Sequence, residues 1–370
     1  GGVYMAYNSL YITYFSRALQ TVSQVGVVLI LIALQGPSLP MIGVSFLVSA
    51  ILMLVAMVLK LRRVCPTLRL RLRSYDRDLL GEMGRLGFWA ILSELGSLLF
   101  IQASMVIVNM MLGSGTQGLF SIAANMIMMV HTACAALAAV SIPLVYREYA
   151  NGEIDELLRV LKIFSKFIGV TMAFPLAYLT VFLPQILGVW LGQDYPELQT
   201  MLCIMLPVEV LICTTSVLSD VPVVFAKVKP LALATFLMGV VNIASASLVI
   251  QYTDAGVNGV CICWAASMIL LKLVFYPVFC HSLTGGSYRR YYMPILEAHL
   301  AFIGSLIVLY AISFVFVPPM TWIGILVPFF LLFLLFFTLE MRFMFSKRDM
   351  DTIRTYLPRF VQRFVEKVTD

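Results

Sequence analysis

Charged residues are scarce in this chain of 370 residues. Asp, Glu, Lys and Arg make up 12% of it, whereas hydrophobic residues make up 61%. A soluble globular protein carries about a quarter of its residues charged, so the composition excludes an ordinary soluble domain. The three His and seven Cys show no spacing typical of a metal site or a disulfide framework. We therefore expect no metal, no disulfide scaffold and no cofactor.

A glycine-rich nucleotide loop and a soluble catalytic domain are also missing, so we expect neither an enzyme nor a nucleic-acid partner. The sequence is dominated instead by apolar runs of roughly 17 to 27 residues, each long enough to cross about 30 Å of hydrocarbon as a helix. Such runs favour a polytopic all-α bundle over a β-barrel. We predict a partial span at 1–15 followed by ten spans, at 19–35, 41–60, 86–111, 118–144, 163–186, 199–220, 230–251, 257–281, 294–316 and 320–343.

Lys and Arg are absent from every second connection between these spans. The connections without them are 36–40, 112–117, 187–198, 252–256 and 317–319. The alternate connections are basic, with Arg17; Arg62, Arg63, Arg69, Arg71, Arg73, Arg77 and Arg85; Arg147, Arg159 and Lys162; Lys227 and Lys229; Arg289 and Arg290; and a tail from Arg342 to Lys367. By the positive-inside rule the basic connections are cytoplasmic. We predict a multi-pass protein of the cell (inner) membrane with a cytoplasmic carboxy terminus.

Two features bear on how the chain is organised. It begins at GGVYMAYNSLYITYFSR without an initiator Met or a signal peptide, so we expect the carboxy-terminal part of a longer protein, unless the two glycines derive from a tag. The helix pair before the basic linker and the pair at 230–281 run in the same direction through the membrane, and each encloses an outward turn with glycine. A parallel repeat of this kind is typical of a two-lobed transporter.

Several segments, in order, resemble the polysaccharide flippases (O-antigen and exopolysaccharide) of the MATE-like superfamily. They are LGSGTQGLFSIAANM (112–126); SIPLVYREYANGEIDELLRVLK (141–162), where Pro143 is expected to close a helix before a polar linker; PQILGVWLGQDY (184–195), with Trp190, Leu191, Gly192 and Tyr195 in the pattern Trp-Leu-Gly-x-x-Tyr; and GVVNIASASLVI followed by AGVNGVCICWAAS. The resemblance covers most of 85–281.

The resemblance implies a fold of two six-helix lobes, with the first lobe incomplete in this chain. The implied domains are the remainder of the first lobe (1–60), a cytoplasmic basic linker (61–85), the second lobe (86–281), two appended transmembrane helices (282–343) and a cytoplasmic tail (344–370). The implied function is to flip undecaprenyl-diphosphate-linked oligosaccharide to the outer leaflet for cell-surface polysaccharide biosynthesis. The implied partners are this lipid-linked oligosaccharide, membrane lipids, and the polysaccharide polymerase and chain-length machinery.

Three ionisable side chains, Glu94, Glu209 and Lys272, fall well inside predicted spans, where charge is costly and marks function. Glu94 and Lys272 lie at matching depths, so an ion pair between them is possible, and Glu209 follows a proline that could open space for water or a proton. Snorkelling of Lys272 and protonated packing of Glu94 are the alternatives. The same cavity could include Gln102, Asn109, Asn125, His131 and Asn242, or these could be helix-to-helix hydrogen bonds.

In the tail, Ser346 and Asp349 have the spacing of a capping box, and Met350, Ile353 and Leu357 share one face. We predict an amphipathic cytoplasmic helix on the membrane surface, interrupted by Pro358.

Other functions stay open at this stage. A MATE-type drug or cation antiporter would share the fold, and acidic cavity residues without a cationic partner would favour it. A membrane-embedded glycan polymerase or ligase would usually show a long outward loop with charged catalytic groups, which this sequence lacks. A scaffold protein would need no charges inside its spans.

Overall fold

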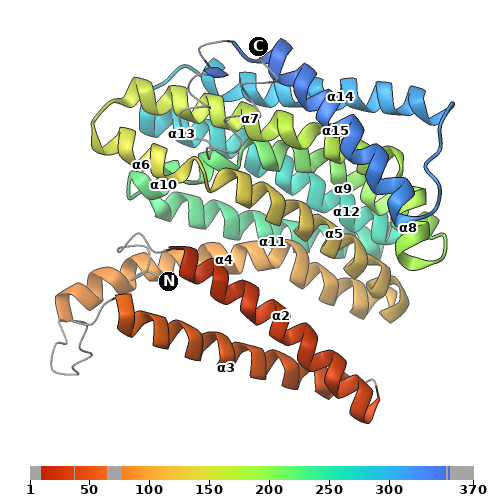
Figure 1. Cartoon of the computed structure of the whole chain (residues 1–370). Helices are drawn as coiled ribbons and strands as arrows, with labels where there is room; N and C mark the ends of the chain where they lie inside the picture. The colour runs from red at the N-terminus through yellow and green to blue at the C-terminus, as the bar shows by residue number, and fades with distance from the viewer. Residues whose placement is uncertain (1–9, 37, 65–76, 347–348, 351–370) are drawn as a thin grey trace. The chain divides into compact units, whose positions relative to one another are not determined.

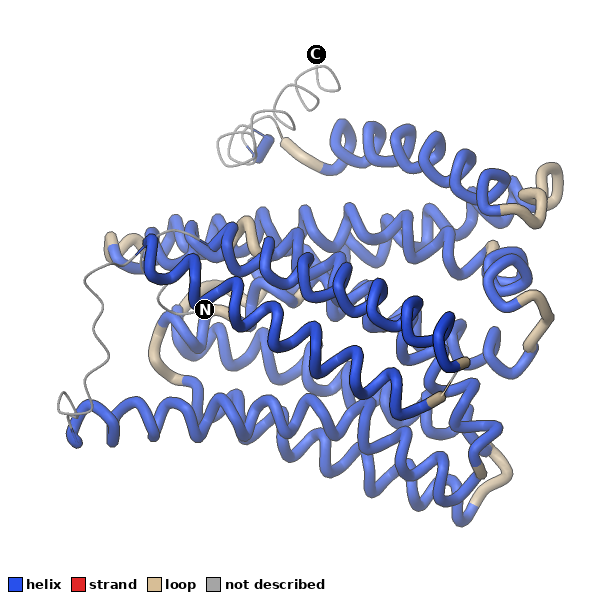
Figure 2. Tube along the Cα trace, turned by 60° about the horizontal axis from the view of Figure 1, so that its bottom comes forward, coloured by secondary structure: helices blue, strands red, loops and turns tan. Residues whose placement is uncertain are grey.

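The computed structural model describes residues 10–36, 38–64, 77–346 and 349–350. Over these residues the chain consists of helices joined by short loops, and Figure 2 shows no strand in the described part. The elements are α2 (Leu10–Gln35), α3 (Leu39–Val64), α4 (Arg77–Leu112), α5 (Ser114–Ala138), α6 (Ile142–Ala150), α7 (Ile154–Val181), α8 (Leu183–Leu191), α9 (Pro196–Thr214), η2 (Ser216–Ser219), α10 (Val221–Val224), α11 (Val228–Tyr252), α12 (Gly256–Ile269), η3 (Leu270–Phe275), α13 (Tyr276–Thr284), α14 (Arg289–Ser313) and α15 (Trp322–Met344).

Ten spans among the described residues are long and apolar enough to cross a membrane. Each matches one of the ten predicted spans in order, and the predicted all-α polytopic bundle is confirmed. The last span before the α14–α15 pair is continuous over Gly256–Thr284 and consists of α12, η3 and α13 in succession.

The prediction for the first residues was wrong in one respect. Residues 10–15 do not belong to a separate partial span, because α2 runs without a break from Leu10 to Gln35. Arg17 therefore lies within a helix and not in a connection between two helices. The sequence could not reveal this. A single Arg after an apolar run is typical of a basic loop between two helices, and the same pattern also occurs within one helix.

Two prolines begin helices where the sequence predicted otherwise, since Pro143 was expected to close a helix and Pro184 to lie inside the span 163–186. Helix α5 stops at Ala138, and Pro143 lies in the first turn of α6, so most of the expected polar linker is helical. In the same way α7 ends at Val181, and Pro184 lies in the first turn of α8. Proline suits the first turn because its missing N–H would have no partner there, and its fixed φ matches the helix.

The chain divides into two compact units, residues 1–80 and 81–370. In the first unit, α2 and α3 pack against each other as a hairpin. Gly36 ends α2 with φ +79°, a left-handed conformation that side chains disfavour, and its N–H bonds to the carbonyl of Ile32 at 2.9 Å. The division falls inside the predicted linker 61–85, while the predicted lobes themselves stay a prediction.

In the second unit the most deeply buried span is α7, which packs against α14, α9, α15, α6 and α5 (Figure 1). Gly169 of α7 allows the closest of these approaches. A Cβ atom there would lie 2.2 Å from Thr214 Oγ1 and 2.7 Å from Ala298 Cβ. Small residues at such crossings let helix backbones pack closely, which supplies much of the stability of a bundle in lipid.

Helix α15 attaches to α7 through aromatic rings and one buried lysine. The ring of Phe174 lies 4.8 Å from that of Phe336 and 6.0 Å from that of Phe333, centroid to centroid. Lys166 forms an ion pair with Glu297 of α14 at 3.0 Å and donates a hydrogen bond to the carbonyl of Met344, the last residue of α15. One cation on α7 thus joins three helices.

The start of the predicted tail is described. Ser346 and Asp349 form a reciprocal capping box: the N–H of Asp349 bonds to Ser346 Oγ at 3.2 Å, and the N–H of Ser346 to Asp349 Oδ2 at 3.3 Å. This part of the prediction is confirmed, and Met350 is buried. The rest of the predicted amphipathic helix, 351–370, lies outside the described residues.

Gly169→Ala should destabilise the bundle, because its Cβ would overlap Thr214 and Ala298. We expect a loss of about 1–3 kcal/mol, the usual result of overpacking, seen as a lower thermal unfolding midpoint of the protein in detergent. Gly304→Ala is the matched control, since a Cβ there meets no atom within 4 Å. Equal midpoints for the two variants would show that the crossing tolerates the methyl group.

Candidate functional site

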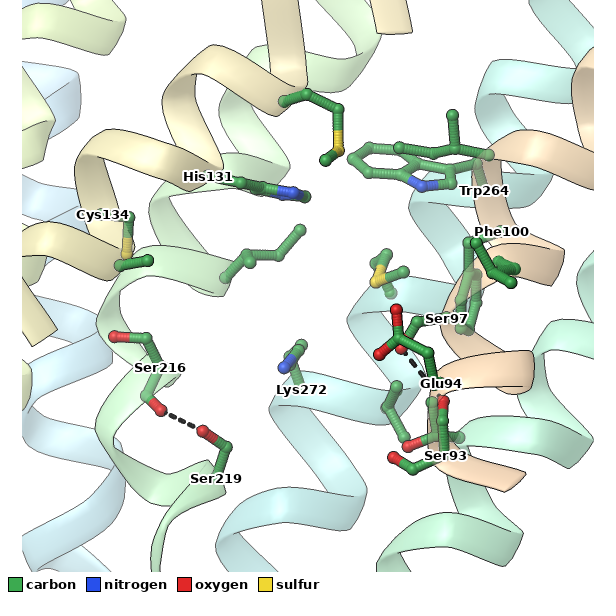
Figure 3. Close-up of a pocket in the computed structure, with 18 of the residues that line it drawn as sticks. Ser93, Glu94, Ser97, Phe100, His131, Cys134, Ser216, Ser219, Trp264 and Lys272 are labelled. Carbon is green, nitrogen blue, oxygen red and sulfur yellow. Dashed lines mark hydrogen bonds between the residues drawn. The ribbon is translucent and has the colours of Figure 1, made fainter. Parts of the chain in front are cut away.

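A cavity of about 400 Å³ lies within the second unit. Its walls come from α4, α5, the end of α9 with η2, α11, and the α12–η3–α13 span. Figure 3 shows side chains from several of these elements pointing into one space. Its lining includes both polar and aromatic residues, which is unusual for a lipid-embedded bundle and is typical of a ligand site.

Lys272 enters this cavity from a π-helical segment, η3. π turns are rare and occur frequently at functional sites. Lys272 Nζ lies 4.1 Å from the centroid of the Tyr276 ring, a cation–π contact. None of the ion pairs in the described part of the chain involves Lys272. The cavity therefore holds a cation whose charge no protein carboxylate within ion-pair distance neutralises.

Hydroxyl groups surround this lysine on two sides. Ser93 and Ser97 project from α4, and Ser216 and Ser219 from η2 (Figure 3). Three of these serines donate their hydroxyl protons to backbone carbonyls: Ser97 Oγ bonds to the carbonyl of Ser93 at 3.1 Å, Ser216 Oγ to that of Cys213 at 2.7 Å, and Ser219 Oγ to that of Ser216 at 2.5 Å. Each hydroxyl oxygen keeps lone pairs that can accept a hydrogen bond from a ligand.

Glu94 also lines the cavity and is exposed. The sequence allowed an ion pair between Glu94 and Lys272, but the structure forms none within 4 Å. The cavity thus holds an acid and a base that face a common space without neutralising each other (Figure 3).

Glu209 does not reach the cavity directly. It is fully buried, and its carboxylate oxygens lie 2.9 and 3.0 Å from Nε2 of His131, which does line the cavity. Its side chain is 0% exposed, against 30% for that of His131. His131 therefore links the buried carboxyl of Glu209 to the cavity.

The predicted polar companions divide into two groups. Gln102 lines the same cavity as Glu94 and Lys272. Asn109 is exposed on α4, Asn125 bonds to the Ser121 carbonyl beside a separate surface hollow, and Asn242 donates to Ser104 Oγ at 3.2 Å, joining α11 to α4. The structure does not bring these three asparagines to the cavity.

Other polar residues of the spans were not singled out from the sequence. Lys166, Glu297 and Glu340 lie in spans, and the first two form an ion pair. A pairing between different helices leaves no signal in one sequence. Trp264 was also missed, since a tryptophan among apolar residues resembles core packing. No three His, Cys, Asp or Glu side chains gather as a metal site in the part of the chain that the structure describes.

Beyond the cavity, Asp220 follows η2 and lies outside the spans. Burial raises the pKa of its carboxyl to about 6 from an ordinary value of 3.8. As the pH falls from above 6 towards 4, the folded state binds a proton at Asp220 before the unfolded state does. Protonation of this carboxyl therefore stabilises the folded state over that pH range. Above pH 6 the buried carboxylate is ionised and destabilises the fold.

Asp220→Asn should therefore stabilise the protein at pH 8 and have little effect near pH 4. The pKa shift corresponds to about 3 kcal/mol at most, which solvent screening at this partly exposed group reduces to about 1–2 kcal/mol. Thermal unfolding across this pH range measures it, with Asp254→Asn, at an exposed residue between α11 and α12, as control. A gain that is the same at both pH values would show that ionisation of Asp220 is not its cause.

The His131–Glu209 pair can be tested by a double-mutant cycle. His131→Leu leaves a fully buried carboxyl without its partner, and we expect a loss of about 3–5 kcal/mol of stability. Adding Glu209→Leu should restore most of this, because no polar group is then left unpaired. His299→Leu is a control, since His299 bonds to the carbonyl of Ile295 and not to a carboxylate. Strictly additive losses would show that the pair is not coupled.

The sequence and the fold were compared with those of known proteins. No family model matches the sequence. The uncharacterized membrane protein EpsK of Bacillus subtilis (strain 168) is 25% identical over 278 residues, which cover 75% of this chain and 55% of that protein. The chain thus spans about half the length of the curated relative that it matches.

The fold is similar to solved structures of MATE proteins. A crystal structure of MATE in the bent conformation has a TM-score of 0.59 at 16% identity, covering 75% of this chain and 63% of that one. Another, of MATE in complex with MaL6, has a TM-score of 0.58 at 16% identity and covers 72% and 63%. The chain is a multi-pass membrane protein with a MATE-like helical bundle.

Proposed function

We propose that the protein is a membrane transporter that flips a lipid-diphosphate-linked oligosaccharide, of the undecaprenyl type, from the cytoplasmic to the outer leaflet. The observation that carries this proposal is the cavity cation, Lys272, which faces serine hydroxyls and, among the described residues, has no carboxylate within ion-pair distance. A diphosphate is the anionic group that such a site would accept, and hydroxyl-rich walls suit sugars. The resemblance of most of 85–281 to polysaccharide flippases supports this proposal, and the MATE-like fold supports a membrane transporter.

Moving a sugar head group across the bilayer requires a polar cavity. A sugar head cannot cross hydrocarbon unaided, because each hydroxyl would lose its hydrogen bonds to water. A polar cavity supplies substitutes while the lipid chain stays in the bilayer, and exposure alternates by rocking of helical lobes. With a negative cell interior, outward movement of the diphosphate is favoured by about 2.3 kcal/mol per charge per 100 mV.

Glu209 and His131 supply a site for an exchanging proton in this proposal. The imidazole lines the cavity and contacts the buried carboxyl, so the pair connects the cavity with a proton-binding group on α9. In this proposal the proton carried by the pair is exchanged as the substrate enters and leaves the cavity.

One observation favours a second candidate, a cation antiporter of the MATE type. Glu94 is exposed in the cavity and forms no ion pair with Lys272. An acidic residue in this state could hold a cationic or amphiphilic substrate. Lys272 opposes this reading, because a cation would meet a like charge in the same cavity.

The decisive experiment uses cells that lack their own flippase and express this protein. We expect lipid-linked oligosaccharide to become accessible on the outer face, and Lys272→Gln to reduce this at least about tenfold at equal expression, the effect of losing one charge-assisted hydrogen bond. Lys229→Gln, at an exposed lysine over Trp89 outside the cavity, is the matched control.

Two outcomes would contradict the proposal. Inserted protein without any flipping, together with efflux of cationic dyes that depends on Glu94, would assign the cavity to cation export. Flipping that is unchanged in Lys272→Gln would remove the lysine from substrate recognition.

A further inference from the structure

Trp264 has a hydrogen-bond donor without a partner. The residue lies on α12, is 1% exposed, and lines the cavity, while its indole Nε1 is buried and makes no hydrogen bond to any residue that the structure describes. Buried tryptophan N–H groups usually find an acceptor. Figure 3 shows the nitrogen edge of the ring turned towards the cavity that Lys272 enters from the other end. The orphaned donor therefore faces a space that a ligand can fill.

The helix that carries Trp264 also sets its relation to Lys272. The two residues are eight positions apart on one continuous span. In a regular α-helix of 3.6 residues per turn they would differ by about 80° around the axis. The wider turn of η3, in which Lys272 lies, reduces this offset. Both side chains consequently reach the same cavity, from points about two turns apart on one span.

The cavity has two chemically different ends. Lys272, Ser216, Ser219, Ser93 and Glu94 form the charged and hydroxylated end. At the other end, Trp264 lies near Phe100, across from His131 (Figure 3). A phosphate is recognised best by a cation, through charge-assisted hydrogen bonds. A neutral N–H donor on an aromatic wall suits a neutral acceptor with an apolar face, which a sugar ring presents.

We propose that Trp264 is the sugar-recognition residue of this cavity, and that its Nε1–H donates a hydrogen bond to a hydroxyl or carbonyl oxygen of the sugar nearest the diphosphate. The inference rests on the proposed function and adds to it the orientation of the substrate. The diphosphate lies at the Lys272 end and the first sugar at the Trp264 end. A site that contains an unpaired buried donor discriminates strongly against ligands that lack the acceptor.

The test is direct binding to the purified 370-residue protein in lipid nanodiscs. The two probes are farnesyl diphosphate and the same lipid diphosphate carrying one N-acetylhexosamine. Trp264→Phe keeps the aromatic ring and removes only the donor, so binding of the sugar-bearing probe should weaken about tenfold, the value of one hydrogen bond to a buried donor. Binding of farnesyl diphosphate should not change.

Two further variants complete the design. Trp264→His retains a ring N–H and should recover part of the lost affinity, which a change in packing alone would not produce. Trp190→Phe is the matched control, since Trp190 lies at the end of α8 and does not line this cavity. Lys272→Gln should weaken both probes alike.

The possible results distinguish the role of Trp264 from the proposed transport function. If wild-type protein binds neither probe, the proposed function fails and the inference fails with it. If wild-type protein binds both but Trp264→Phe affects neither, or affects both equally, the function stands and the role of Trp264 is refuted. If Trp264→Phe is misfolded, Trp264→His decides: folded protein with a weakened but retained preference for the sugar-bearing probe supports the role, and an unchanged or abolished preference overturns it.

Discussion

Hydrocarbon offers no water to a polar group, so each such group in the second unit has to find its partner within the protein. Lys166 pairs with Glu297, Asn242 bonds across to Ser104, and His131 meets Glu209. Each of these contacts joins two helices, and each would leave a costly unpaired group if one partner were lost. Two cavity side chains depart from this rule. Among the described residues, Lys272 has no counter-charge within ion-pair distance and Trp264 Nε1 has no acceptor, and both face a space that a ligand can occupy.

The second unit thus separates packing from recognition. Helices α7, α14 and α15 are held together by a glycine crossing, a set of stacked aromatic rings and one buried lysine. None of these contacts involves the cavity. The cavity is built instead from α4, α5, α12 and the segments that follow α9. A firmly packed group of helices can therefore serve as a fixed support while the cavity residues respond to a substrate.

Sequence patterning predicted the number and order of the spans, because a run of about 20 apolar residues has one favourable state in a bilayer. It also predicted the capping box at Ser346, since that motif is local. Helix ends near Pro143 and Pro184 were misplaced, because a proline can stop one helix or begin the next. The pairing of His131 with Glu209 and the gathering of Glu94, Gln102 and Lys272 depend on contacts between distant segments. Neither is encoded in local spacing, and Trp264 carried no signal at all.

The π turn at η3 sets how the two halves of its span face the cavity. Such a turn holds about one residue more than an α turn, and it takes up that residue within its own width. If one residue were removed between Trp264 and Lys272, the two would lie seven positions apart in a regular helix and differ by about 20° around its axis. Both would still share one face. The π turn is therefore a local widening that brings Lys272 towards the face of Trp264 while the helix continues on either side of it.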